Sequence, residues 1–362
     1  MTSSVWFTRL VIRSFRNLAA LELAPGPHLN VITGDNGQGK TSLLEALYVV
    51  ATTRSFRTES LRDAIREGDD LATVIARVRE DDQDREQRAV VGARTRRYLL
   101  DGNRPDRLAQ YATRTPVVVF HPGDLALVAG AAALRRQLLD RVALYTDASS
   151  LYHRARYTQA LRERQAALDA RGPTAPDLPV FERLMADHGA RWATARRSAA
   201  EHVAATLSPV FARVAPRDLT LYVEYLPGGT EEVELFARRL VETRPTDARR
   251  RSATFGPQRD DLDLALNGRS ARKHASQGQQ RILTLALKLA ELDCIRAARQ
   301  AQPVLLLDDV SSELDPARTG AVYELLRDTA SQVFVTTTRS ELLGSGPTSD
   351  RVEWVLDGGN LL

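Results

Sequence analysis

The sequence predicts an α/β fold, with a mixed sheet around a phosphate-loop helix and a second, mainly helical lobe that carries a short helical-hairpin arm. Strand-like and helical segments alternate at both ends of the chain, whereas helical patterns fill its middle. A glycine-rich loop lies between an apolar strand-like segment and an amphipathic helix near the N-terminus. These patterns favour an α/β lobe built from residues 1–125 and 270–362, interrupted by a helical lobe at residues 126–269.

The N-terminal segments are expected to form strands around one helix. Residues 7–15 alternate between apolar and polar side chains, and residues 28–33 form a second strand-like run before the glycine-rich turn. Residues 41–50 are apolar at helical spacing. Four further short strands are expected at residues 72–79, 89–93, 98–100 and 117–120.

The middle of the chain is helical and rich in Ala, Leu and Arg. One helical stretch covers about residues 131–170, and a second covers about 180–207 and ends before Pro209. Two helices of about 30 residues joined by a proline-rich turn predict an antiparallel hairpin. This arm, about residues 131–209, is far shorter than a coiled-coil tether.

The last third of the chain returns to alternating strands and helices. A wholly apolar run at residues 304–307 is typical of a buried strand. The other expected elements are strands at residues 219–226 and 332–336 and helices at residues 279–299 and 316–329.

The composition is that of an ordinary globular chain, with 43% hydrophobic and 27% charged residues. No apolar run approaches the roughly 18 residues of a membrane span, and the N-terminal segment has no secretory pattern. The single cysteine, Cys294, excludes an intramolecular disulfide and a cysteine-rich zinc site. A cytoplasmic location and no membrane partner are expected.

Arginine dominates the basic residues, because only Lys40, Lys273 and Lys288 of the 50 are lysine. Arginine binds phosphate with a planar fork of N–H donors, so clustered arginines would suit nucleic acid. A genome-wide composition bias explains the same numbers, and the sequence does not separate the two explanations.

The glycine-rich turn matches the phosphate-binding pattern G-x-x-x-x-G-K-[ST], and it has the preceding strand and following helix that the motif requires. Lys40 is expected to bridge the β- and γ-phosphates, and Thr41 to bind magnesium. The alternative, a glycine-rich surface turn, is weakened because lysine is rare in this chain. The expected nucleotide-binding residues are Gly34, Asp35, Asn36, Gly37, Gln38, Gly39, Lys40, Thr41 and Ser42.

Two adjacent acids, Asp308 and Asp309, follow the apolar strand at residues 304–307. A buried strand delivers its C-terminal carboxylates to the crevice where ligands bind in such sheets. Asp308 is expected to hold magnesium, and Asp309 to orient or deprotonate the attacking water, so that Asp309 and Lys40 are the catalytic candidates. A solvated acidic turn is the alternative for this stretch taken alone.

A second anion-binding helix start is expected just before the helix at residues 279–299. A serine hydroxyl and a glycine backbone at a helix N-terminus suit a phosphate group. A simple N-cap is the alternative interpretation of the serine. The residues concerned are Ser276, Gln277, Gly278 and Gln279.

The order of these three motifs resembles the ABC-ATPase superfamily, whose signature motif has the form S-x-G-x-x. In that superfamily the signature contacts the γ-phosphate held by the partner subunit. The resemblance implies an ABC-type ATPase head, with ATP and magnesium as cofactors, whose sites are completed by homodimerisation. The segment Ser312-Glu313-Leu314-Asp315 resembles the superfamily's D-loop at the dimer seam.

A closer resemblance, to the RecF family of bacterial recombination mediators, extends over essentially the whole chain. It implies a weak, DNA-stimulated ATPase that dimerises on ATP, binds duplex DNA and single-strand/duplex junctions, and cooperates with RecR and RecO in loading RecA. The segments that carry it are residues 9–18, 39–48, 54–57, 121–125, 135–140 and 256–262.

Two features depart from transporter-type ABC ATPases, and a third element of those enzymes, the glutamine lever loop, is not located in the sequence. The stretch Thr336-Thr337-Thr338-Arg339 has no switch histidine, which is similar to the RecF group. Asp309 replaces the more usual glutamate, and its shorter reach predicts slow hydrolysis. The region 117–124, where a glutamine lever loop is expected, contains no glutamine.

The sequence leaves DNA contacts and two rival functions open. Phosphate contacts are hypothesised among the clustered arginines, although most exposed arginines are only a solvated face. An SMC-like chromosome-organising head would need much longer arms, and a transporter ATPase subunit would need a membrane-coupling surface. The candidate DNA contacts are Arg135, Arg136, Arg196, Arg197, Arg249, Arg250 and Arg251.

Overall fold

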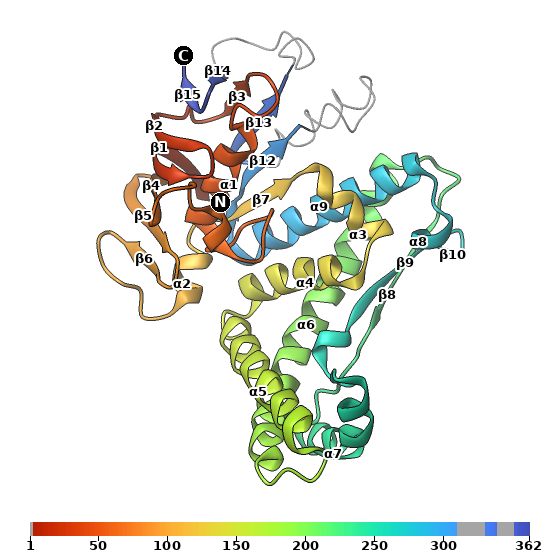
Figure 1. Ribbon diagram of the computed structural model, residues 1–362. Helices are drawn as coiled ribbons and strands as arrows, with labels where there is room; N and C mark the ends of the chain where they lie inside the picture. Colours follow the sequence, from red (N-terminus) through yellow and green to blue (C-terminus); the bar gives the residue numbers. More distant parts are fainter. Residues whose placement is uncertain (1–2, 310–329, 339–350) are drawn as a thin grey trace. The chain divides into compact units, whose positions relative to one another are not determined.

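The structure, a computed structural model (Figure 1), describes residues 3–309, 330–338 and 351–362. The chain divides into two compact units. Unit 1 comprises Met1–Asp124 and Ile295–Leu362, and unit 2 comprises Leu125–Cys294.

The boundary between the units at the C-terminal side differs from the expected residue 270, because helix α9 (Gln277–Arg299) lies mostly in unit 2. Glu291 of α9 accepts hydrogen bonds from both Nε and Nη2 of Arg141, which lies on helix α4 (Ala132–Thr146). The thiol of Cys294, near the end of α9, lies 3.5 Å from the hydroxyl of Thr206. These side-chain contacts with residues of unit 2 explain why most of α9 belongs to that unit.

A parallel sheet forms one layer of unit 1. Its strands, in spatial order, are β15 (Asn360–Leu361), β14 (Arg351–Asp357), β3 (Leu29–Thr33), β13 (Gln332–Thr337), β12 (Val304–Asp308) and β7 (Val117–Phe120). All neighbours are parallel except β15 and β14. β12 and β13 are buried along their whole length, as expected for apolar strands covered on both faces. The carboxyl ends of the parallel strands lie along one edge, which is where Asp308 ends β12.

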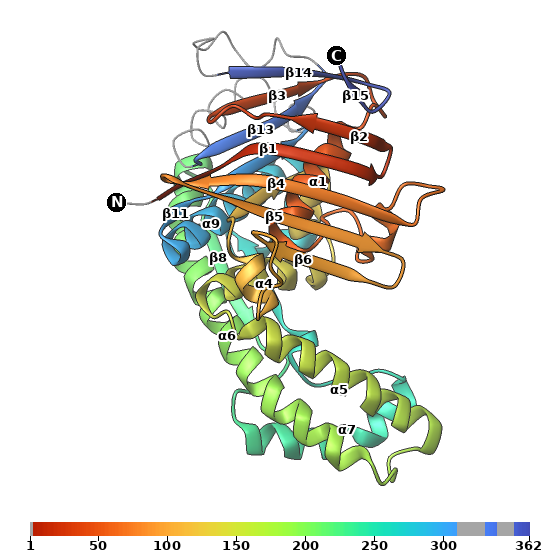
Figure 2. The ribbon, with the colours of Figure 1, turned by 90° about the vertical axis from the view of Figure 1, so that its left-hand side faces the viewer.

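A second, antiparallel sheet shares its core with helix α1 (Lys40–Thr52). Buried apolar residues of α1 pack between side chains from both sheets, and Figure 2 shows α1 behind the antiparallel strands. The strand order is β11-β1-β4-β5-β6, with β2 paired to β1. The bounds are β1 (Ser3–Phe15), β2 (Leu18–Leu23), β4 (Leu71–Glu80), β5 (Gln83–Gly92), β6 (Arg96–Leu100) and β11 (Ala301–Gln302).

Short elements connect these strands, and several have no clear sequence signal. Strands β14 and β15 and helix α2 (Leu108–Ala112) were not expected. The remaining short helices are η1 (Leu61–Ala64), η2 (Pro122–Leu125), α3 (Ala126–Ala129), η3 (Pro257–Arg259) and α8 (Ala271–His274).

Residues 132–214 form three helices where the sequence predicts two. The first predicted stretch is divided into α4 and α5 (Ser150–Arg171), and the carboxylate of Asp147 accepts hydrogen bonds from the backbone N–H and hydroxyl of Ser149 at the break. Such local bonds compete with helical ones. α5 packs against α6 (Leu178–Val214), so the antiparallel hairpin lies between these two helices.

Helix α6 continues through Pro209, so the predicted end before this residue is wrong. Proline removes one backbone donor and crowds the preceding turn. Leu207, Val210 and Phe211 are nevertheless buried on both sides of Pro209. Their burial outweighs the local cost of the proline.

Unit 2 also contains a small antiparallel sheet and a helix that the sequence did not reveal. The sheet order is β10-β9-β8, with β8 (Leu221–Leu226) expected and β9 (Asp261–Leu266) and β10 (Arg269–Ser270) not. Helix α7 (Val233–Arg250) contains Pro245, which obscures its helical pattern.

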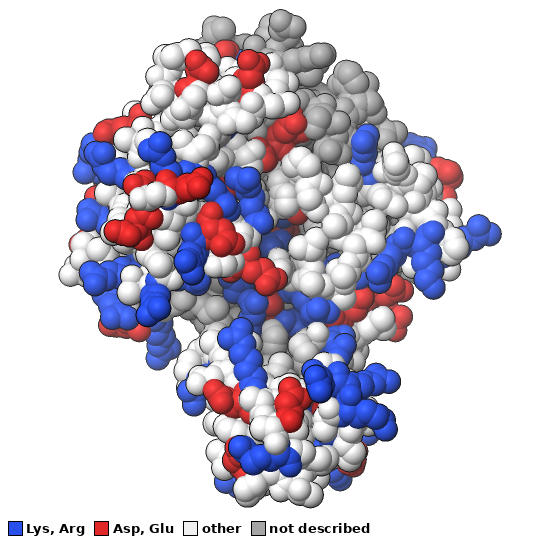
Figure 3. Space-filling view, in the orientation of Figure 1, with Lys and Arg blue, Asp and Glu red and all other residues white. Residues whose placement is uncertain are grey.

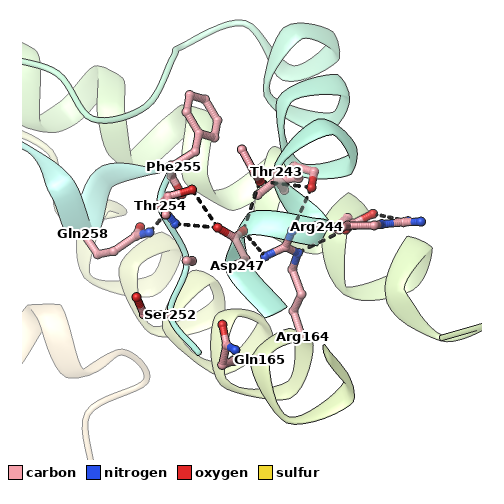
Figure 4. Close-up of polar contacts among 12 residues, drawn as sticks. Arg164, Gln165, Thr243, Arg244, Asp247, Ser252, Thr254, Phe255 and Gln258 are labelled. Carbon is pink, nitrogen blue, oxygen red and sulfur yellow. Dashed lines mark hydrogen bonds and ion pairs between the residues drawn. The ribbon is translucent and has the colours of Figure 1, made fainter. Parts of the chain in front are cut away.

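A buried ionic network joins α7 to the α5–α6 hairpin (Figure 4). Asp247 of α7 accepts hydrogen bonds from Arg164 Nη1 at 2.8 Å, from the Thr243 hydroxyl at 3.0 Å and from the Thr254 backbone at 2.9 Å. Arg164 of α5 also donates to Glu182 of α6 at 3.1 Å. Because every charge in this network has a partner, the three helices are locked in one arrangement.

None of the helices in the described part of the chain is both long enough and apolar enough to cross a membrane.

Candidate functional site

The phosphate loop between β3 and α1 depends on glycines at three positions. Gly34, Gly37 and Gly39 have φ angles of 145°, 85° and 108°, which disfavour other residues. A Cβ atom at Gly34 would lie 2.3 Å from the backbone oxygen of Leu356, and one at Gly39 would lie 2.8 Å from Leu18 Cδ2. The loop therefore curls tightly against strands β14 and β2.

Lys40 opens helix α1 and is almost completely buried. Its Nζ donates to the backbone oxygens of Gly34 at 2.7 Å and Asp35 at 2.9 Å. The loop thus holds the ammonium group above its own curled backbone. A positive charge in this position, at a helix N-terminus, attracts a phosphate group.

The first residue after Lys40 meets the end of the acidic strand. The Thr41 hydroxyl donates to Asp308 Oδ1 at 2.9 Å, and the Thr336 hydroxyl donates to the same oxygen at 2.8 Å. Burial raises the pKa of Asp308, while the hydrogen bonds from Thr336 and Thr41 oppose this rise. A nearby cation would relieve the cost of burying this charge.

These residues fit a magnesium ion. A hydroxyl and a carboxylate are oxygen ligands of the kind that Mg²⁺ prefers, and Mg²⁺ commonly uses one or two carboxylates together with substrate phosphates. Burial raises the pKa of Asp308, and a bound cation would stabilise the charged form of this carboxylate. When bound, the ion would neutralise phosphate charge at this point.

Asp309 lies just beyond the strand and has a left-handed backbone, with φ 47°. Its backbone N–H donates to Thr336 at the hydroxyl, 3.0 Å, and at the carbonyl oxygen, 3.2 Å. Strained backbone conformations of this kind are held in place by their surroundings and cluster at functional sites. Here the conformation places Asp309 on the wall of the pocket beside Asp308.

A pocket of about 520 Å³ unites the phosphate loop and the acids within unit 1. Its volume is in the range of small-molecule sites. Asp63 and Ile65 belong to it although no sequence pattern marks them. The lining residues are Arg16, Asn17, Asn36, Gly37, Gly39, Lys40, Thr41, Ser42, Arg57, Asp63, Ile65, Asp308, Asp309 and Thr336.

Two of the predicted nucleotide-binding residues also fasten the loop to its neighbours. The Ser42 hydroxyl donates to Asn17 Oδ1 at 2.8 Å, and Asn17 Nδ2 donates to the Gly37 oxygen at 3.1 Å. The side-chain oxygen of Gln38 accepts a hydrogen bond of 2.6 Å from the N–H of Gly358. The β1–β2 and β14–β15 turns thus support the loop.

A buried carboxylate of α1 holds two arginines at the pocket. Glu45 is fully buried and accepts two hydrogen bonds from Arg16, at 2.9 and 2.7 Å, and one from Arg57 at 3.2 Å. It also accepts a bond from the Ser55 hydroxyl. A single glutamate inside an apolar helix was the available sequence signal for this cluster.

The Ser276 motif begins α9 in unit 2 and forms a reciprocal cap. The Ser276 hydroxyl accepts from the Gln279 N–H at 3.3 Å, and Gln279 Oε1 accepts from the Ser276 N–H at 2.9 Å. The simple N-cap interpretation is therefore present in the structure. Gln277 and Gly278 are exposed, and a Cβ at Gly278 would meet nothing within 4 Å. Residues 312–315, the helix expected at 316–329 and Arg339 lie outside the described residues.

Four of the arginines proposed as DNA contacts have other partners. Arg135 and Arg196 are buried: Arg135 forms a two-point ion pair with Asp261 at 2.7 and 3.0 Å, and Arg196 binds Asp140 and Asp260, each at 2.8 Å. The hypothesis that these two contact DNA is wrong, because guanidinium groups bound in this way are not available to phosphate.

The other arginines of that set are accessible to different degrees. Arg136 donates to the Asp260 backbone oxygen at 2.9 Å, and Arg197 forms an ion pair with Glu231. Arg249, Arg250 and Arg251 are exposed at the end of α7. This last group keeps the accessibility that the hypothesis requires, and the side chain of Arg197, which is 42% exposed, keeps part of it.

Comparisons with known proteins agree over nearly the whole length. Residues 6–357 match the RecF/RecN/SMC N terminal domain family. The DNA replication and repair protein RecF of Anaeromyxobacter sp. (strain Fw109-5) is 38% identical over 359 residues, which covers 97% of both chains. The RecF of Myxococcus xanthus (strain DK1622) is 35% identical and covers 97% of this chain and 96% of its own.

Solved structures show the same relationship. A structure of the recombination mediator protein RecF-ATPrS in the RecFOR pathway superposes with a TM-score of 0.89 at 25% identity, covering 99% of this chain and 98% of that chain. An Smc head bound to the C-winged helix domain of ScpA reaches a TM-score of 0.53 at 14% identity, with 98% and 96% of the chains covered. The second likeness concerns the fold alone.

Proposed function

The chain belongs to the RecF family, and we propose that it is an ATP-dependent DNA-binding clamp of recombinational repair and replication restart. The observation that carries the proposal is the pocket of unit 1, in which Lys40 and the Thr41–Asp308 hydrogen bond lie at the mouth of a phosphate loop. Two observations on similar proteins support it. Relatives of similar length are DNA replication and repair proteins, and a similar solved structure is that of RecF-ATPrS in the RecFOR pathway.

The residues of the pocket have separate roles in ATP use. Lys40 binds the β- and γ-phosphates, and Thr41 and Asp308 hold magnesium. Asp309 orients or deprotonates the attacking water, and its short side chain makes turnover slow. ATP therefore acts as a dimerisation switch with weak, DNA-stimulated hydrolysis.

Two copies of the chain complete each ATP site. The capped start of α9 presents exposed Gln277 and Gly278, so a γ-phosphate held by another copy has access to backbone N–H groups there. Ser276 serves the partner's nucleotide in this arrangement, while Lys40 serves its own. A head-to-tail pair then contains two complete sites.

DNA binding is proposed to be independent of sequence and to rely on phosphate contacts. The part of unit 1 seen in Figure 3 carries basic and acidic side chains intermixed, so no single broad basic stripe identifies the contact there. Exposed Arg249, Arg250 and Arg251 are candidates in unit 2. Binding to duplex DNA and to single-strand/duplex junctions should weaken steeply between low and moderate salt.

The cellular setting is proposed from the family. RecR and RecO are the partners, and the outcome is the loading of RecA at gaps in the cytoplasm. An SMC-like chromosome-organising head is the alternative, but the hairpin of α5 and α6 is short compared with the arms that such heads carry.

Sedimentation velocity tests the proposal directly. The wild-type chain should be monomeric without nucleotide and dimeric with ATP and magnesium. Ser276→Arg should bind ATP as a monomer but fail to dimerise, whereas Lys40→Ala should lose tight ATP binding altogether. Ser208→Arg, at an exposed position of α6, is the matched control and should dimerise normally. If the hydrolysis-deficient Asp309→Asn variant stays monomeric with ATP and duplex DNA, the clamp proposal is wrong.

A further inference from the structure

One face of the antiparallel sheet in unit 1 is open among the described residues. Leu10 and Ile12 of β1 are buried on the inner face, where the sheet shares its core with α1. Arg9 and Arg13, which alternate with them, are exposed, and Val11 between them is only half-buried. In Figure 2 this outer face is turned to the viewer and α1 lies behind it.

Strand register assembles an aliphatic strip on this outer face. Residues directly opposite each other on antiparallel strands share a face and touch. Across the sheet, Val11 is opposite Ile75, Ile75 opposite Arg88, and Arg88 opposite Leu99. In the next row Arg13 is opposite Thr73, Thr73 opposite Val90, and Val90 opposite Arg97. The half-buried aliphatic residues of the strip are Val11, Ile75, Val90 and Leu99.

Positive charge surrounds this strip. Three of the arginines on the face form ion pairs with acids on the same face: Arg9 with Glu22, Arg79 with Asp84, and Arg88 with Glu86. Three more have no ion pair with any described residue, and they come from different strands: Arg13, Arg77 and Arg97.

Strand pairing also brings two arginines of this face together. Arg9 and Arg77 lie directly opposite each other on β1 and β4, while Glu86 of β5 lies opposite Arg77 on its other side. Like charges in such cross-strand positions destabilise a sheet. A negatively charged ligand on this face would relieve the repulsion.

Three occupants of the face can be compared by their chemistry. The phosphates of nucleic acid would match the arginines but offer nothing apolar to Val11, Ile75 and Leu99. The same face of a second copy would bring positive charge against positive charge. A protein segment with carboxylates and aliphatic side chains matches both parts of the surface.

We propose that the outer face of this sheet, formed by the aliphatic strip and by Arg13, Arg77 and Arg97, docks an acidic protein segment that carries aliphatic side chains between its carboxylates. The guanidinium groups bind the carboxylates, and the strip covers the aliphatic side chains of the partner. This docking does not depend on the ATP pocket, so its test is independent of the test of the proposed clamp.

Fluorescence anisotropy with a labelled probe tests the docking face on the full chain. The probe is an amphipathic helical peptide of glutamate, leucine and alanine, with its leucines in one stripe flanked by glutamates. The triple variant Arg13→Glu/Arg77→Glu/Arg97→Glu should bind the peptide at least tenfold more weakly than the wild-type chain. A second triple variant, with glutamine at the same positions, should lose less peptide affinity. Circular dichroism of both variants shows whether they are folded, so that a loss of affinity is not mistaken for misfolding.

A matched control separates this face from general charge attraction. Arg62, Arg104 and Arg107 are exposed in unit 1, lie outside the strands of the sheet and have no ion pair with a described residue. Changing these three to glutamate should leave peptide affinity within about twofold. An equal loss of peptide affinity in the control would overturn the proposal, because exposed arginines anywhere on unit 1 would then bind the peptide equally well.

Two further measurements decide between protein and nucleic acid. Ile75→Thr/Leu99→Thr removes apolar contact but keeps strand-forming residues, and should weaken peptide binding several-fold. Duplex DNA affinity should be unchanged in the glutamate variant at positions 13, 77 and 97. The proposal is overturned if the threonine variant binds the peptide normally, or if the glutamate variant loses DNA and keeps the peptide.

Discussion

The hydroxyl of Thr41, in the first turn of α1, donates a hydrogen bond of 2.9 Å to the carboxylate of Asp308 at the end of β12. The loop before the helix and the strand come from opposite ends of the chain, and the parallel sheet brings them together. A carboxylate and a hydroxyl that already share a hydrogen bond are spaced so that one cation can contact both. This contact therefore marks the metal end of the proposed ATP site.

We expect Asp308→Asn to remove the magnesium dependence of ATP binding. The amide keeps the shape of the side chain but loses the negative charge that would hold the ion. ATP affinity in the presence of Mg²⁺ should fall at least tenfold, or about 1.4 kcal/mol, while affinity without Mg²⁺ should change little. Isothermal titration with and without Mg²⁺ measures the difference. Asp263→Asn, at an exposed position of β9, is the control. Equal losses with and without Mg²⁺ would contradict the assignment.

Asp309→Asn should separate ATP binding from ATP hydrolysis. The asparagine tolerates the left-handed backbone at this position but cannot take a proton from water. Phosphate release should fall by about 10²-fold or more, while ATP-dependent dimers should accumulate. A phosphate-release assay combined with size-exclusion chromatography checks both outcomes. A variant that hydrolyses ATP at the wild-type rate would remove Asp309 from the catalytic candidates.

Gly34→Ala should destabilise the protein more than Gly37→Ala. Both glycines have positive φ, and an alanine there costs about 1–2 kcal/mol. At Gly34 the new Cβ would also lie 2.3 Å from the oxygen of Leu356, whereas at Gly37 it would meet nothing within 4 Å. The free energy of unfolding, measured by urea denaturation, should therefore fall further for Gly34→Ala. Equal losses would show that strand β14 shifts at Leu356 without cost.

Asp247→Ala should be among the most destabilising single changes in unit 2. It would leave the buried guanidinium of Arg164 with Glu182 as its one remaining carboxylate partner, and breaking a buried ion pair costs about 3–5 kcal/mol. Thermal unfolding followed by circular dichroism measures the effect. Asp187→Ala, at an exposed position of α6, should cost far less. A small effect of Asp247→Ala would mean that water enters the network and replaces the carboxylate.

Acid stability should depend on Glu291. Burial alone would raise the pKa of this glutamate, but Arg141 and Lys288 hold the pKa at about 2. Because the folded pKa is below the unfolded one, the contribution to stability is complete at neutral pH and is lost as the pH falls below about 5 toward 2. The effect amounts to roughly 3 kcal/mol at most.

The variant Glu291→Gln should flatten this part of the pH profile. Urea denaturation at a series of pH values between about 6 and 3 tests the prediction. Glu163→Gln, at an exposed position of α5, should keep the wild-type slope. If Glu291→Gln also keeps that slope, other carboxylates dominate the acid sensitivity.

Local sequence signals were sufficient for the centre of the pocket. The curl of the phosphate loop follows from its glycines, and the position of Asp308 follows from a buried strand that ends there. Both depend on neighbours within a few residues. The motifs, together with the rule that ligands bind at the carboxyl ends of strands in such sheets, predict that Lys40, Thr41 and Asp308 lie close together, and all three line one pocket.

The rest of the pocket depends on contacts between distant segments. Asp63 of the short helix η1 and Ile65 directly after it line the pocket, although no recognisable sequence pattern marks them. Nothing in the sequence shows that Glu45 will bind Arg16 and Arg57, because such pairing depends on how the β1–β2 turn and the segment after α1 fold over the helix. Tertiary contacts of this kind have no local signature.

Two features of unit 2 also could not be predicted from local sequence. Arg135 and Arg196 looked like surface charges in a helical pattern, yet each is buried against aspartates more than 50 positions away. Pro209 looked like the end of a helix, yet the buried residues beside it extend α6 to Val214. Helical periodicity identifies a face, but it does not say what will cover that face.

The left-handed backbone at Asp309 bears on the rate of ATP hydrolysis that we propose. Among residues with a side chain, aspartate and asparagine adopt this conformation most readily, because their short polar groups bond to the nearby main chain. Glutamate, with its longer reach toward water, would strain the same turn. The main-chain conformation at this position thus favours the shorter acid, which agrees with the slow hydrolysis that we propose.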